Sequence, residues 1–202
     1  MDWFLRIKHW QLFLLLAGIP MLFQIFFIVI FVRQDNPELY FSFFPVIMIV
    51  CMGIFFGWFY ALGTNLYKKL PPEVKMNLKL FKIFLTVPVC YILVICVFMS
   101  VTFSKFMEVA PGDSPHMAVY ASVFIPVHLF AMFCIFYCLY FIAKTMKAVE
   151  WQRPVTFSDY AGEFFLLWFY IIGIWILQPR INKLFDKKND DLSNESFSFD
   201  KN

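Results

Sequence analysis

The chain has 202 residues, of which 61% are hydrophobic and 22% aromatic, and its formal net charge is +3. Because an ordinary soluble domain is roughly 45–50% apolar, this composition argues against a water-soluble fold. The small net charge, without a run of Lys and Arg that carries interleaved aromatic residues, argues against nucleic acid as a partner.

Four long apolar blocks are separated by short stretches that hold the charged residues. The blocks cover residues 12–32, 41–62, 84–103 and 117–142, and none of them contains Asp, Glu, Lys or Arg. Each block is long enough to cross about 30 Å of hydrocarbon at about 1.5 Å per residue. Since lipid cannot satisfy exposed backbone groups, and barrel strands alternate over about ten residues, the pattern predicts an all-α, polytopic membrane helix bundle.

The first block is too long for the apolar core of a secretory signal, which is about 7–15 residues. It is followed by Arg33-Gln34-Asp35 instead of a small-residue cleavage site, so we expect an uncleaved first span. Gln24 lies near its middle and His128 near the middle of the fourth block. A polar group in hydrocarbon needs a partner. Gln24 and His128 are therefore expected to bond to each other or to carbonyls freed by Pro20, Pro88 and Pro126, or to line a candidate polar pocket for a lipophilic ligand.

The second block contains Gly53, Gly57 and Ala61 at intervals of four residues. This spacing places small side chains on one helix face, where another helix can approach closely. The face is predicted to pack against helices of this chain or against a partner.

The connection after the second block contains five of the basic residues, including Lys75, Lys79 and Lys82. Over residues 73–83 these three lysines share one face of a helical pattern, and apolar residues share another. The pattern predicts an amphipathic surface helix whose lysines contact anionic lipid headgroups. Ordinary anchoring of the span by positive charge is the alternative.

A metal site or another cofactor is not expected. The three histidines are dispersed, and Cys134 and Cys138, although four residues apart on one helix face, lack further ligands at a suitable spacing. The known catalytic and nucleotide-binding fingerprints are also missing. An enzyme is therefore not the preferred hypothesis.

A fifth apolar segment, residues 164–177, is shorter than the others and is bracketed by Asp159, Glu163 and Arg180. Its length favours a re-entrant or interfacial element over a fifth span. The three charged residues form a candidate site at the cytoplasmic interface. Residues 1–185 are expected to form a single membrane domain, and the polar stretch 186–202 a disordered cytoplasmic tail.

The basic residues concentrate before the first block, in the second connection and in the fourth. By the positive-inside rule these regions and both termini are cytoplasmic. We expect a multi-pass protein of a bacterial inner membrane, whose partners are membrane lipids and another membrane protein or a second copy.

Three functional hypotheses remain open at this stage. The preferred one is a non-catalytic accessory or interaction subunit of a larger membrane complex, or a homo-oligomer. The second is binding or transport of a lipid or other lipophilic molecule near Gln24 and His128. The third is a membrane-embedded enzyme that acts through Asp159, Glu163 and Arg180.

Overall fold

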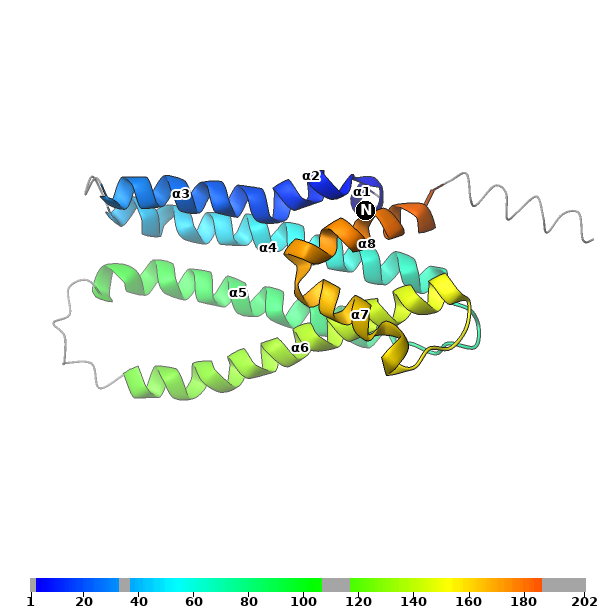
Figure 1. The fold of residues 1–202 in the computed structure, drawn as a ribbon. Coiled ribbons are helices and arrows are strands. Elements are labelled where there is room, and N and C mark those ends of the chain that lie inside the picture. The colour runs from blue at the N-terminus through cyan, green and yellow to red at the C-terminus, as the bar shows by residue number, and fades with distance from the viewer. Residues whose placement is uncertain (1–2, 33–36, 107–116, 187–202) are drawn as a thin grey trace, which may run out of the picture. The chain divides into compact units, whose positions relative to one another are not determined.

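The computed structural model describes residues 3–32, 37–106 and 117–186. Within these ranges all regular secondary structure is helical, so the predicted all-α class is confirmed. The elements are α1 (Trp3–Arg6), α2 (His9–Phe13), the π-helical segment η1 (Leu14–Gly18), α3 (Ile19–Val32), α4 (Pro37–Lys68), α5 (Leu78–Phe106), α6 (Met117–Trp151), α7 (Phe157–Trp168) and α8 (Tyr170–Leu184). The eight α-helices are labelled in Figure 1.

Four stretches of helix within the described ranges are long and apolar enough to cross a membrane: His9–Val29, Phe44–Lys68, Leu78–Met99 and Ser122–Trp151. They correspond to the four predicted blocks, and the chain is a membrane-embedded helix bundle. Helices can extend past the apolar blocks: α6, for example, continues through Lys144 and Lys147 to Trp151.

The first span changes its helical winding before a proline. Residues Leu14–Gly18 form a π-helical turn, and Pro20 follows two residues later in α3. Proline lacks an N–H and crowds the carbonyl of the residue four positions earlier, and a single π turn is a common way to absorb such a mismatch. The Leu16 carbonyl, four residues before Pro20, therefore lies in a wider helical turn.

The predicted surface helix over residues 73–83 is wrong in its first half. Residues 73–77 are outside any helix, and α5 begins at Leu78. Asn77 accounts for this start, because its side-chain oxygen accepts a hydrogen bond from the N–H of Leu80 at 3.0 Å. Such a cap stabilises a helix that begins just after the Asn. Lys75 precedes α5, whereas Lys79 and Lys82 lie on its first turns.

The chain forms two compact units, and each is assembled from segments that are distant in sequence. Unit 1 contains residues 1–17, 58–76 and 139–202, and unit 2 contains residues 18–57 and 77–138. The expectation of a single membrane domain remains a prediction. The predicted tail, apart from Asp186, lies outside the described residues.

In unit 1, α7 and α8 fold back on each other as a helical hairpin, and α8 also packs against α1 and α2 (Figure 1). Its buried core includes large apolar side chains from α2, α4, α6 and α8, namely Leu12, Trp58, Leu62, Phe141, Met146, Ile174 and Leu177. This packing brings the first and last helices of the described chain together.

In unit 2, α5 and α6 run antiparallel with a constant register. The Cys138 thiol reaches the Phe81 carbonyl at 4.0 Å. Ten residues further along α5 and ten residues back along α6, the Tyr91 hydroxyl and His128 Nδ1 are 3.0 Å apart. Ten helical residues correspond to about 15 Å, about half of the hydrocarbon thickness.

Candidate functional site

Four charged side chains form an ion-pair network where the end of α6 meets the α7–α8 hairpin. Arg180 of α8 donates from Nε to Glu150 Oε1 at 2.9 Å, and its Nη2 donates to the second oxygen of the same carboxylate. Arg180 Nη2 also donates to Glu163 Oε1 of α7 at 2.7 Å, and Lys147 Nζ donates to this oxygen at 3.0 Å. Two positive and two negative charges thus balance at the junction of three helices.

Glu163 occupies the centre of this network and is buried. Burial raises the pKa of its carboxyl group, but hydrogen bonds from Arg180 and Lys147 outweigh this effect and hold the pKa below its usual range. Glu163 is therefore charged at neutral pH. A carboxylate in this state is a weak base, so the arrangement suits a structural junction better than proton transfer.

The structure brings together two of the three residues of the predicted interface site. Glu163 and Arg180 are paired, whereas Asp159 belongs to a capping box at the start of α7. The Asp159 carboxylate accepts hydrogen bonds from the N–H and the hydroxyl of Thr156 at 2.8 and 2.9 Å. These bonds lower the pKa of Asp159 and assign it a helix-starting role.

A second polar cluster is centred on Gln178 of α8, whose side chain is fully buried. Its Nε2 donates to the carbonyls of Phe4 and Ile7 at 2.8 and 3.2 Å and to Asn182 Oδ1 at 3.1 Å. Its Oε1 accepts a hydrogen bond from the Trp58 indole N–H at 3.3 Å. Gln178 therefore satisfies carbonyl groups at the end of α1, which a short helix leaves unpaired.

The hairpin turn requires a glycine in α8. A Cβ atom built on Gly173 would lie 1.7 Å from the Leu166 carbonyl oxygen and 2.6 Å from its carbon. The two backbones thus touch, as small residues allow between helices. At the break between the helices, the Phe169 N–H donates to the Phe165 carbonyl at 2.8 Å, and the N–H groups of Ile172 and Gly173 donate to the Phe169 carbonyl at 3.0 and 2.9 Å.

The two polar residues predicted at mid-membrane do not meet. His128 bonds to Tyr91 of α5 instead, and the His128 side chain is exposed. Gln24 is also exposed on α3, and no described residue gives it a hydrogen bond. The predicted polar pocket remains a prediction, with Tyr91 as the observed partner of His128.

The predicted small-residue face changes character along α4. Ala61 is fully buried, Gly57 is half-buried and Gly53 is exposed. A Cβ built on Gly53 would meet no described atom within 4 Å. Only the Ala61 end of the face is therefore packed within the described chain.

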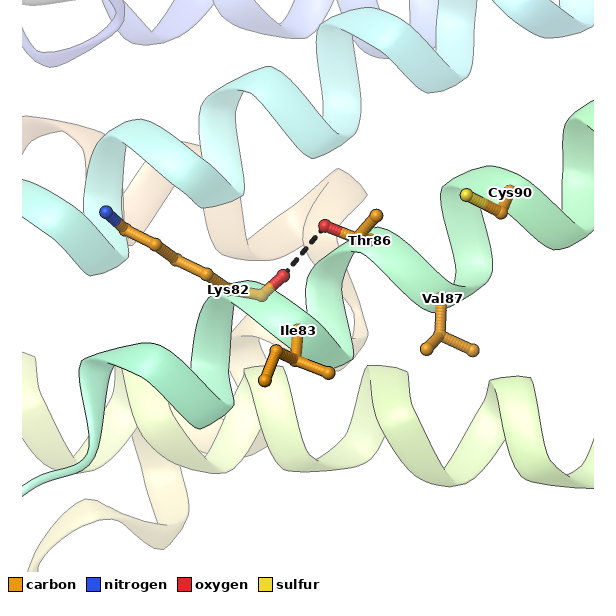
Figure 2. Close-up of a pocket in the computed structure, with 5 residues that line it drawn as sticks. All are labelled: Lys82, Ile83, Thr86, Val87 and Cys90. Atoms are coloured by element: carbon orange, nitrogen blue, oxygen red, sulfur yellow. Dashed lines mark hydrogen bonds between the residues drawn. The ribbon is translucent and has the colours of Figure 1, made fainter.

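A surface hollow of about 470 Å³ lies along the first half of α5. The described residues that line it are Lys82, Ile83, Thr86, Val87 and Cys90, and Figure 2 shows them along this one helix. The Thr86 hydroxyl donates to the Lys82 carbonyl at 2.9 Å within the helix. The hollow thus offers a cationic end followed by apolar side chains, an order that suits a lipid lying along the helix.

No group of three or more His, Cys, Asp and Glu side chains is arranged for metal binding within the described ranges. Cys134 and Cys138 are buried in α6. Among the described residues, no buried side-chain nitrogen or oxygen lacks a hydrogen-bond partner.

Lys147, Glu150 and Gln178 belong to these clusters but were not predicted from the sequence as site residues. Lys147 and Glu150 are three residues apart near the end of a long helix, a spacing that places them on one face. The buried Gln178 carried a weaker signal, because a single amide between apolar residues and a proline does not reveal its partner.

Comparison of the chain with protein-family models, curated protein sequences and solved structures found no match. The functional argument therefore depends on the geometry of these clusters and on the exposed apolar faces.

Proposed function

We propose that the chain is a non-catalytic integral membrane protein that acts by contact with another membrane protein or with a second copy of itself. The observation that carries this proposal is the use of its charged groups. Glu150, Glu163, Lys147 and Arg180 are all engaged in internal ion pairs, while most of the large side chains that remain exposed on the spans are apolar. The chemistry available to a partner is therefore mainly apolar packing.

The exposed end of the small-residue face supports this proposal. Gly53 leaves open space beside α4, and large apolar side chains such as Val46, Ile49 and Val50 are exposed on the same helix. A partner helix could approach the backbone closely at this point. We assign this end of the face to contact with a second membrane protein or another copy.

The experiment is purification from native membranes in a mild detergent, followed by measurement of the mass of the complex. The proposal expects a stoichiometric membrane partner or a defined homo-oligomer, and it expects Gly53→Leu to reduce that complex. Val94→Leu, on an exposed position of α5, is the control. A monomer without a partner, in both native membranes and detergent, would contradict the proposal.

Binding of a lipophilic molecule is the second candidate, and the Tyr91–His128 pair favours it. Tyr91 lies near the middle of the α5 span, Leu78–Met99, and His128 is exposed beside it. An exposed polar pair at that depth can hydrogen-bond the polar end of a lipophilic ligand. Lipid extraction of the purified protein, followed by mass spectrometry, should then recover a ligand that the Tyr91→Phe, His128→Leu double variant loses.

We also propose that the protein lies in a bacterial inner membrane with its amino terminus, the Lys68–Lys82 connection and its carboxyl terminus in the cytoplasm. The distribution of Lys and Arg supports this orientation. Cysteines introduced beside Lys68 and Lys188 should react with an impermeant maleimide only after intact cells are opened. Rapid labelling of both cysteines from outside intact cells would contradict this orientation.

A further inference from the structure

The turn end of the α7–α8 hairpin exposes many large apolar side chains. No charged residue occurs between Glu163 and Arg180. The exposed side chains gather around the turn: Phe165, Trp168, Phe169, Ile171, Ile172, Trp175 and Ile176. A contiguous apolar surface of this kind indicates a lipid or protein contact.

The contacts of α8 with the first span give the depth of this surface. At the charged end, Gln178 and Asn182 bond to the carbonyls of Phe4 and Ile7. Further toward the turn, the Trp175 ring lies 4.9 Å from that of His9 and 5.5 Å from that of Phe13. The helices thus run in opposite directions, and the turn lies beyond the level of Trp175, alongside residues within the first span, which begins at His9.

The turn at residues 169–172 is therefore deeper in the membrane than the charged residues Arg6 and Lys8. Tyr170 is five residues from Trp175 along α8, about 7.5 Å by helical rise. Three N–H groups at the turn, those of Phe169, Ile172 and Gly173, are hydrogen-bonded within the hairpin. Irregular backbone in a low-polarity environment requires such internal partners.

We propose that α7 and α8 form a re-entrant hairpin whose exposed turn inserts among the acyl chains of the leaflet on the amino-terminal side. Lipid is the occupant because the turn lies alongside the first span, which is itself in the membrane. The ion-pair network of Lys147, Glu150, Glu163 and Arg180 lies away from the turn, between the middle of α7 and the last turns of α8. It fixes the insertion depth, since these charges resist entry into hydrocarbon.

Two cysteine variants of matched exposure test this proposal. Ile172 at the turn is 65% exposed and Phe157 at the start of α7 is 60% exposed, so a hairpin surrounded by water would present both equally. Purified Ile172→Cys and Phe157→Cys are reconstituted at a high ratio of lipid to protein, in vesicles made permeable to a charged maleimide. The unsubstituted protein measures the background from the native cysteines.

We expect Ile172→Cys to react severalfold more slowly than Phe157→Cys, and both to react equally after unfolding in a strong detergent. A cysteine-linked nitroxide at each site should show high contact with oxygen at residue 172 and high contact with a water-soluble relaxant at residue 157. Equal rates in vesicles, fast or slow, would overturn the proposal. Protection of Ile172→Cys that disappears on dilution with lipid would also overturn it, because a second copy would then cover the turn.

Discussion

The contacts inside unit 1 differ in kind from those inside unit 2. In unit 1, buried polar groups join helices that are far apart in sequence, as Gln178 joins Phe4 and Arg180 joins Glu150. In unit 2, the described contacts between α5 and α6 include aromatic pairs such as Phe84 with Tyr137, and the hydrogen bond of Tyr91 to His128. The difference indicates that unit 1 is specified by directional bonds, whereas unit 2 depends more on packing and on its surroundings.

The hairpin turn should provide the largest effect of a single substitution. Gly173→Ala places a methyl group against the Leu166 backbone, which no side-chain rotation can relieve. We expect a loss of about 3 kcal/mol of unfolding free energy, the upper part of the usual overpacking range, measured by denaturation in detergent. Gly162→Ala is the matched control, because a Cβ there meets no described atom within 4 Å; it should be neutral or slightly stabilising. Equal behaviour of the two variants would refute the close contact.

Glu163→Gln tests whether the ion pairs specify unit 1. The substitution leaves Lys147 without its carboxylate, while Arg180 keeps Glu150. We expect the free energy of unfolding to fall by about 2–3 kcal/mol. This is at the lower limit of the roughly 3–5 kcal/mol that breaking a buried ion pair costs, because Arg180 keeps its second partner. Asp159→Asn, at the capping box of α7, should cost clearly less unfolding free energy than Glu163→Gln. A loss at Asp159 larger than that at Glu163 would contradict the distinction.

The same network predicts how stability depends on pH. Because the folded pKa of Glu163 is lowered, its contribution is present above its unfolded pKa of about 4.3 and is lost as pH falls through the folded pKa. Denaturation midpoints should therefore fall more steeply in acid for the unsubstituted protein than for Glu163→Gln. Parallel curves would show that Glu163 is not the titrating group.

Gln178→Leu should lower the free energy of unfolding somewhat less than Glu163→Gln does. It removes the side-chain partner of the Phe4 carbonyl and of the Trp58 indole N–H, and one of the two donors to the Ile7 carbonyl, which keeps its bond from Asn182. The expected cost is about 2 kcal/mol, within the range for unsatisfied buried polar groups, together with faster proteolysis near α1. If proteolysis cleaved the amino terminus of the variant no faster than that of the unsubstituted protein, Gln178 would not be required to keep α1 packed against α8.

His128→Leu should have the smallest effect, because the Tyr91–His128 bond is exposed in unit 2. Hydrogen bonds between membrane helices contribute about 0.6 kcal/mol on average, and denaturation in detergent should show a change of that size. A loss comparable to that of Gln178→Leu would indicate that unit 2 is also specified by buried polar bonds.

The spans could be predicted from the sequence because hydrocarbon imposes length and apolarity on each helix separately. The break of residues 164–177 at Phe169 into two helices could not be predicted in this way, since it depends on Gly173 meeting Leu166 across the hairpin. Glu163 and Arg180 could be identified by their charge beside an apolar segment, but the same criterion wrongly grouped Asp159 with them. Only the fold shows that Asp159 serves Thr156 and that His128 faces Tyr91.

The bond from Gln178 to the Phe4 carbonyl joins residues 174 positions apart, which has a consequence for the order of assembly. At roughly 5–20 residues per second, a ribosome needs on the order of ten to thirty seconds to reach Gln178 after Phe4 has been made. The first span thus enters the membrane long before its final neighbour exists. Until the last helix has been synthesised, the amino-terminal helix lacks its final contacts and is accessible to chaperones or to another chain.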